Sequence, residues 1–121
     1  MDYAAASFGQ GIAVTPLAFL RAVSVLASGG ALVKPYVIDR IAAEDGRDLA
    51  TESEIHPGVV KRETAETMTK MLVRVVDEAL LGGALKNPRY SIAAKTGTAQ
   101  IANPAGGGYS DEYLHAFFGY G

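Results

Sequence analysis

The apolar residues of the chain recur with the period of an α-helix in two segments. The first begins at Thr15 and Pro16, where a hydroxyl can cap free backbone N–H groups and a proline lacks an N–H that would need a partner. We expect this helix to run to about Ala27 and to end at Ser28–Gly30. Only two of its side chains are polar, so its solvent-facing stripe is narrow, as in an interior helix of a larger body.

The second helical segment covers about Arg62–Leu81. Its apolar residues follow the i, i+3, i+4 rule. They are Met68, Met71, Leu72, Val75, Val76, Ala79 and Leu80. Glu66 and Lys70 are four residues apart on the other side, where they can form an ion pair. The pattern predicts an amphipathic helix that ends at Gly82–Gly83 and whose apolar stripe, both methionines included, belongs to the core.

The segment between these helices has the alternation and the turn residues of a β-hairpin. Strands are expected at Tyr36–Ile38 and Arg40–Ala42, and Glu44–Gly46 is typical of a hairpin turn. Pro35 cannot donate a hydrogen bond to a strand ladder, so it indicates an edge strand.

Two more strands are expected after the second helix. Asn87–Pro88 forms a turn, and Ser91 then begins a short strand of small and apolar residues that ends in Lys95. A loop rich in glycine leads to "YLHAFFGYG", which starts at Tyr113 and is apolar on both alternating faces. Such a strand normally has layers packed on both sides, and His115 within it is expected to be a packed, hydrogen-bonded core histidine.

Composition limits the classes of function. The chain has 121 residues, of which 49% are hydrophobic and 20% charged, as suits one globular unit with a modest core. The net charge of −2, with Lys and Arg spread along the chain, argues against a nucleic-acid partner. With no cysteine, and with His56 and His115 far apart and without companion ligands, neither a disulfide nor a metal site is expected, and nothing implies a cofactor. No apolar stretch has the length of a membrane span, and no signal peptide opens the chain.

The sequence Lys95-Thr96-Gly97-Thr98 is the one local group of residues with a clear chemical use. An ammonium group and two hydroxyls converge at a strand edge, and Gly97 lets a ligand approach the backbone. Such an edge could hold an extended peptide and its carboxylate. Taken alone, however, the four residues favour the simpler interpretation, an ordinary strand that ends in a polar turn.

Three motifs together resemble the penicillin-binding transpeptidases of peptidoglycan synthesis, in particular the class B, monofunctional type that serves cell elongation and division. "SFGQGIAVTPLAFLRAVSVLASGG" is similar to the family segment in which S-x-G-Q-G precedes a T-P-L helix, although its glycines also suit a simple turn. "KTGTAQ" resembles the motif of the active-site strand, and "HAFFGYG" resembles the neighbouring strand. The resemblance implies an α+β fold, with an antiparallel sheet and packed helices, as in penicillin-binding transpeptidases and serine β-lactamases.

The resemblance also implies roles for the residues of the "KTGT" strand. Lys95 would set the electrostatics beside the catalytic serine, and the hydroxyls of Thr96 and Thr98 would hold the carboxylate of a D-alanyl-D-alanine donor or of a β-lactam. The backbone N–H of Thr98 would be one of two oxyanion-hole donors. Gly97 would keep the groove open. Lys95 and Thr98 are thus the expected catalytic residues, and Thr96, Gly97 and Thr98 the expected substrate-binding residues.

The family's other two motifs are absent from the sequence. No serine has a lysine three positions on, as S-x-x-K requires, or an asparagine two positions on, as S-x-N requires. We therefore expect residues 1–121 to be the C-terminal portion of a transpeptidase domain, inactive alone and able to self-associate where the missing N-terminal part would pack. The resemblance implies an extracytoplasmic parent protein anchored to the bacterial membrane.

Two other interpretations remain open on sequence. A fragment of a β-lactamase or of a β-lactam sensor domain shares K-T-G. A short, non-catalytic module that binds peptide carboxylates along the Lys95 strand would explain the same residues without a nucleophile.

Overall fold

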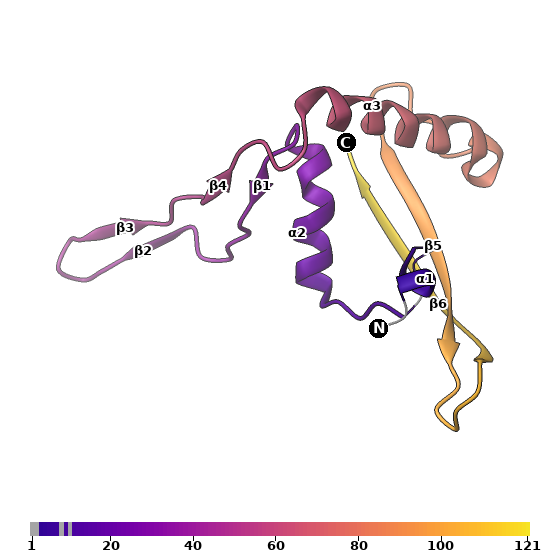
Figure 1. The fold of residues 1–121 in the computed structure, drawn as a ribbon. Coiled ribbons are helices and arrows are strands. Elements are labelled where there is room, and N and C mark those ends of the chain that lie inside the picture. Colours follow the sequence, from indigo (N-terminus) through magenta and orange to yellow (C-terminus); the bar gives the residue numbers. More distant parts are fainter. Residues whose placement is uncertain (1–2, 8, 10) are drawn as a thin grey trace. The chain divides into compact units, whose positions relative to one another are not determined.

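The computed structural model of the protein describes residues 3–7, 9 and 11–121, and the chain forms two compact units (Figure 1). One unit contains Met1–Pro16 and Lys70–Gly121, and the other contains Leu17–Thr69. The helical elements are α1 (Tyr3–Ala6), α2 (Pro16–Ala27), α3 (Arg62–Arg74), the π-helical turn η1 (Val75–Ala79) and the 3-10 turn η2 (Leu80–Gly83). The strands are β1 (Leu32–Val33), β2 (Arg40–Ala42), β3 (Asp48–Ala50), β4 (Ile55–His56), β5 (Ala93–Ala102) and β6 (Tyr109–Tyr120).

Helix α2 has the predicted bounds. The N–H of Gly30 closes its C-terminus by donating to the carbonyl of Val25 at 2.8 Å. Gly30 has φ +95°, and a Cβ at this position would clash with the carbonyl oxygen of Val60, so a left-handed turn and a close backbone approach both require glycine. Val25 is the one side chain of the helix that is buried in the described part of the chain. Its placement as an interior helix of a larger body therefore stays a prediction.

Residues 32–56 form an extended arm of two short antiparallel ladders, β1 with β4 and β2 with β3. The predicted hairpin turn and the strand Arg40–Ala42 are confirmed, but the predicted strand Tyr36–Ile38 is wrong. The first strand of the arm lies earlier, at Leu32–Val33. Pro35 follows it and has no N–H to donate, which accounts for the interruption between the two ladders.

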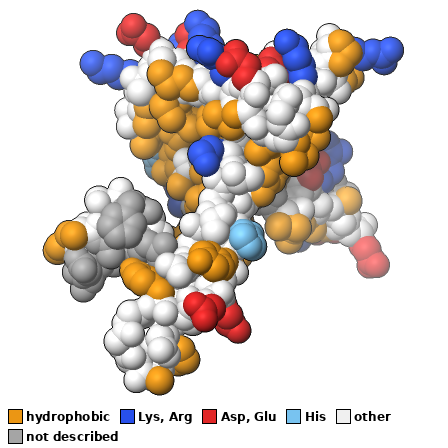
Figure 2. Space-filling view, turned by 90° about the vertical axis from the view of Figure 1, so that its right-hand side faces the viewer, with side chains coloured by type: hydrophobic (Ala, Val, Ile, Leu, Met, Phe, Trp, Pro, Cys, Tyr) orange, Lys and Arg blue, Asp and Glu red, His pale blue; other side chains and the backbone are white. Residues whose placement is uncertain are grey.

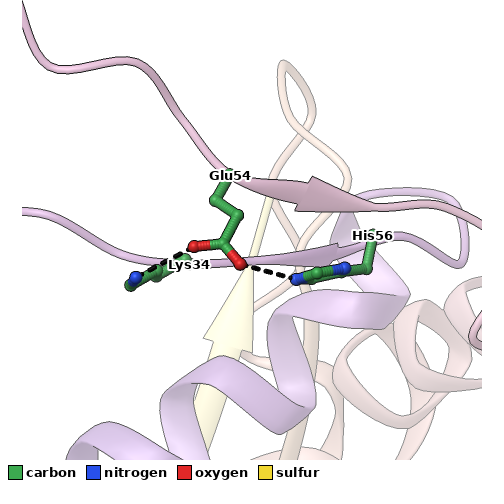
Figure 3. Close-up of polar contacts among 3 residues, drawn as sticks. All are labelled: Lys34, Glu54 and His56. Carbon is green, nitrogen blue, oxygen red and sulfur yellow. Dashed lines mark hydrogen bonds and ion pairs between the residues drawn. The ribbon is translucent and has the colours of Figure 1, made fainter.

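A cluster of polar side chains joins the strands at the base of the arm (Figure 3). One carboxylate oxygen of Glu54 accepts from the Lys34 ammonium at 2.9 Å, and the other lies 2.9 Å from His56 Nε2. The hydrogen bond from Lys34 and, to a smaller extent, the one from His56 hold the pKa of the Glu54 carboxyl below its usual value. All three side chains are exposed, so the cluster ties the strands together without forming a core.

The predicted second helix is confirmed in position but not in its regularity or its burial. The α-helical part ends at Arg74, and the chain continues through η1 and η2 to the predicted glycines. Within the predicted apolar stripe, Leu72 and Val76 are buried, whereas Met68 is 40% and Met71 56% exposed. The assignment of both methionines to the core is therefore wrong, because both side chains are exposed in the described part of the chain. Glu66 lies 3.9 Å from Arg62 instead of pairing with Lys70.

Strands β5 and β6 form an antiparallel ribbon, as predicted for the Lys95 strand and the "YLHAFFGYG" strand. The prediction that the first strand ends at Lys95 is wrong, since β5 continues to Ala102 and pairs with β6 along its length. Only the first two residues of β5, Ala93 and Ala94, are buried, at 1% exposure each, where β5 contacts η1. The ribbon is therefore anchored at one end.

Many apolar side chains lie at the surface (Figure 2). Among them are Leu17, Leu20, Val37, Ile41, Leu49, Leu114 and Phe117. The predicted layers on both faces of the β6 strand are not found in the described residues, where only its Ser110, Phe118 and Tyr120 are partly covered. Among the described helices, none combines the length and the apolar character needed to cross a membrane.

Candidate functional site

The four residues predicted to carry the chemistry, Lys95–Thr98, lie in the middle of β5. The register places Thr96 opposite Phe117 and Thr98 opposite His115 on β6. Because side chains alternate between the faces of a strand, both threonine hydroxyls lie on one face of the ribbon, and Lys95 belongs to the other. The structure thus brings the two predicted carboxylate-binding hydroxyls together.

Among the described residues, the ammonium group of Lys95 has a backbone carbonyl as its partner and no carboxylate. Its Nζ donates to the carbonyl of the next residue, Thr96, at 2.6 Å, and the side chain is exposed. Among the described residues, Lys95 forms no ion pair. A cation without a carboxylate partner can bind an anionic ligand or stabilise negative charge that develops in a reaction.

The Thr98 hydroxyl has a partner that sequence reasoning missed. Its Oγ1 lies 3.3 Å from Nδ1 of His115, directly across the ribbon. The prediction that His115 is a packed core residue is wrong, because its side chain is exposed, although it is hydrogen-bonded as expected. The residue pattern of the two strands contained no signal for this pair, since the contact depends on a register that only the folded ribbon defines.

Two glycines of the ribbon stand in different surroundings. A Cβ on Gly97 would meet only the Cβ of Ala116, at 3.8 Å, which is ordinary van der Waals contact. A Cβ on Gly119 would lie 3.2 Å from the Cβ of Ala94 and 3.3 Å from the carbonyl oxygen of Ala93. Packing therefore explains Gly119 but not Gly97. A ligand that approaches the backbone closely would explain Gly97.

The buried end of β5 positions these groups. Ala93 and Ala94 are almost completely buried beside η1, whose Val76 is 1% exposed. Their small side chains allow the strand to pack closely against η1. The predicted site begins at the next residue, Lys95, which is the first exposed residue of the strand.

An open, mostly apolar groove of about 710 Å³ lies beside the distal half of the ribbon. Its lining includes Ile12, Gln100, Tyr109 and Leu114, and it does not include the Lys95–Thr98 side chains among the described residues. The groove therefore borders the candidate site without being part of it.

The other sequence motif, "SFGQG", stands near the start of the chain. The Ser7 hydroxyl donates to the carbonyl of Ala4 at 2.7 Å, a local contact that fits a structural role for this residue. Phe8 and Gln10 lie outside the described residues.

The comparison with protein families identifies the class. The family model described as the penicillin binding protein transpeptidase domain matches residues 1–121. The chain belongs to this family, and its helices and antiparallel strands form part of the α+β transpeptidase fold.

Three relatives illustrate the match. Penicillin-binding protein PbpB of Mycolicibacterium smegmatis is 37% identical over 114 residues, which cover 86% of this chain and 17% of that protein. The peptidoglycan D,D-transpeptidase FtsI homolog of Nephroselmis olivacea is 26% identical, over 98% of this chain and 25% of that protein. The crystal structure of penicillin binding protein 3 from Mycobacterium tuberculosis superposes with a TM-score of 0.77 at 34% identity, over 92% of this chain and 26% of that one. The chain thus spans about a quarter or less of these relatives.

Proposed function

We propose that residues 1–121 are the C-terminal portion of a serine D,D-transpeptidase domain. In that reaction a serine hydroxyl attacks the D-alanyl-D-alanine bond of a peptidoglycan stem peptide and releases the terminal D-alanine. The resulting serine ester then passes the acyl group to an amine of a neighbouring stem peptide. The observation that carries the proposal is the "KTGTAQ" strand on an exposed ribbon in a chain of the penicillin-binding family.

The proposed site residues are those of the β5 strand. Lys95 sets the electrostatics beside the serine, and the hydroxyls of Thr96 and Thr98 hold the donor's carboxylate. The Thr98 N–H serves the oxyanion hole, where one lost donor costs about 3 to 4 kcal/mol. Gly97 leaves room for the ligand. The lack of an ion pair on Lys95 and the unfilled space around Gly97, in the described chain, support these roles.

The nucleophile belongs to a part of the domain outside this sequence. No serine of the chain stands in S-x-x-K or S-x-N. We call the complete domain a polypeptide in which this segment follows its own S-x-x-K and S-x-N motifs. Its proposed partners are stem peptides and β-lactams, and its proposed location is outside the cytoplasm with a membrane anchor. Structures of Mycobacterium tuberculosis penicillin binding protein 3 with aztreonam and with ampicillin support the assignment of β-lactams as ligands.

The family match does not favour the other two interpretations, a fragment of a β-lactamase or β-lactam sensor domain and a non-catalytic module that binds peptide carboxylates. A β-lactamase would share K-T-G but hydrolyse its acyl-enzyme rapidly, and a non-catalytic module would form no acyl-enzyme even in the complete domain.

Intact-mass measurements after incubation with benzylpenicillin test the proposal. We expect a stable adduct of one penicillin on the complete domain, none on its denatured form, and none on residues 1–121 alone. Rapid return of the unmodified mass with released penicilloate would indicate a β-lactamase. An adduct on residues 1–121 would show that a serine of this segment is activated and would contradict the proposed division of the site.

A further inference from the structure

We propose that His115 is a positioning residue for the Thr98 hydroxyl, and that it controls the direction in which this hydroxyl donates. The inference rests on the proposed function, in which the Thr98 hydroxyl binds the carboxylate of the D-alanyl-D-alanine donor or of a β-lactam. His115, on the neighbouring strand β6, thereby takes part in carboxylate recognition.

The contact comes from the register of the ribbon. Thr98 and His115 are directly opposed, and Oγ1 lies 3.3 Å from Nδ1. Opposed residues of an antiparallel pair have their side chains on the same face. The pairing is therefore maintained by the backbone ladder and does not depend on flexible side chains reaching across.

The ring of His115 is further held by its neighbours on the same face. Tyr113 stacks on it, with ring centroids 6.4 Å apart and an interplanar angle of 21°. The hydroxyl of Tyr113 in turn lies 3.4 Å from the side-chain nitrogen of Gln100, the residue opposite it. This row of contacts restricts the imidazole, so that Nδ1 faces Thr98.

The chemistry of the contact depends on which atom carries the proton. A hydroxyl has one hydrogen to donate. If Nδ1 is unprotonated, the Thr98 O–H donates to the imidazole, and the hydroxyl then has no hydrogen for a carboxylate. If Nδ1 carries a hydrogen, it donates to Oγ1, and the O–H of Thr98 turns outward to donate to the ligand. His115 thus supports carboxylate binding in the form that has Nδ1 protonated.

The test compares variants of the complete domain by their rate of acylation with benzylpenicillin and with its methyl ester, which lacks the carboxylate charge. His115→Phe retains a ring but removes the donor. It is expected to lower the rate with the free acid about fivefold, the effect of one ordinary hydrogen bond. The rate with the ester should stay unchanged. His115→Asn, whose amide nitrogen can replace Nδ1–H, is expected to restore most of the rate with the acid.

Two further variants separate positioning from general structural damage. In a Thr98→Val background, His115→Phe should have no additional effect, because the hydroxyl on which it acts is gone. His56→Phe makes the same replacement on β4 of the arm, outside the ribbon, and should change neither rate. If His115→Phe does not fold, as judged by thermal unfolding, His115→Ala takes its place.

The outcomes distinguish the inference from the proposed function. Equal losses with acid and ester, a loss that persists in the Thr98→Val background, or no loss at all would overturn the role of His115 while leaving the transpeptidase assignment intact. A wild-type complete domain that forms no penicillin adduct would overturn the proposed function, and the role of His115 with it.

Discussion

The arm of residues 32–56 and the β5–β6 ribbon are both two-stranded antiparallel structures, yet their polar side chains are used differently. In the arm, charges pair with each other: Lys34 with Glu54, and Arg40 with Asp48 at 3.2 Å. In the ribbon, no ion pair joins β5 to β6 among the described residues, and Lys95 donates only to a backbone carbonyl next to it.

The difference separates polar groups that stabilise a hairpin from those that are available to a ligand. A two-stranded ribbon is at most marginally stable in water. The arm adds exposed ion pairs across its strands, whereas the ribbon is anchored where Ala93 and Ala94 are buried beside η1. Because burial at one end stabilises the ribbon, its exposed centre need not use the charge of Lys95 for stability.

The largest expected effect is the loss of acylation in Lys95→Met. The substitution keeps the length of the side chain and removes the charge, and loss of such electrostatic stabilisation in an acyl-transfer site costs on the order of 100- to 1000-fold in rate. Acylation of the complete domain by benzylpenicillin measures it, while the midpoint of thermal unfolding should stay unchanged. A large fall in that midpoint would mean that Lys95 stabilises the ribbon, as the arm's charges stabilise the arm.

The two ribbon glycines provide a matched pair. Gly97→Ala fits within the chain and should leave stability unchanged, but the added methyl should displace a ligand and slow acylation by about 100-fold. Gly119→Ala crowds Ala94 and should destabilise the domain by about 1 kcal/mol or more. Thermal unfolding and acylation rates measured on both variants should show opposite patterns. If both variants changed stability and acylation rate in the same way, the data would contradict the assignment of Gly119 to packing and of Gly97 to ligand binding.

The anchor of the ribbon is tested by Val76→Ala. Val76 is 1% exposed in η1, and removal of two buried methyl groups with partial cavity formation should cost about 2 kcal/mol of unfolding free energy. Denaturant unfolding of the complete domain measures the loss. Met71→Ala, at an exposed position of α3, is the control and should cost much less. Equal costs would mean that the remainder of the domain covers both positions.

The smallest effect is expected for Glu54→Gln in the arm. The pKa of Glu54 is lowered chiefly by the hydrogen bond from Lys34, so the stability from this carboxylate is present above its usual value of 4.5 and is lost as pH falls through the lower folded value. Thermal unfolding between pH 7 and pH 3 should show a small advantage of the wild type over the variant that disappears in acid. Glu44→Gln, in the turn, is the control. If the wild type were still more stable than Glu54→Gln at pH 3, the ionised Glu54 carboxylate would not be the source of the difference.

Much of the local structure could be predicted. The start of α2 at Pro16, the glycines after α2, and the turn at Glu44–Gly46 lie where expected. Turns and helix ends follow from the backbone preferences of a few residues, so they are visible without a partner. Burial was harder to predict, as the exposed methionines of α3 and the exposed His115 show. An apolar pattern indicates which face could be buried, and only the neighbouring layer determines whether it is.

The sequence by itself determined the family motifs and the ends of α2, and it supplied the groups proposed to hold a carboxylate. The tertiary structure decided that Lys95–Thr98 lie within a strand instead of at its end, and that Thr98 faces His115. The physical reason is register: local preferences specify that a segment is extended, but long-range backbone pairing between β5 and β6 specifies which side chains meet across the ribbon.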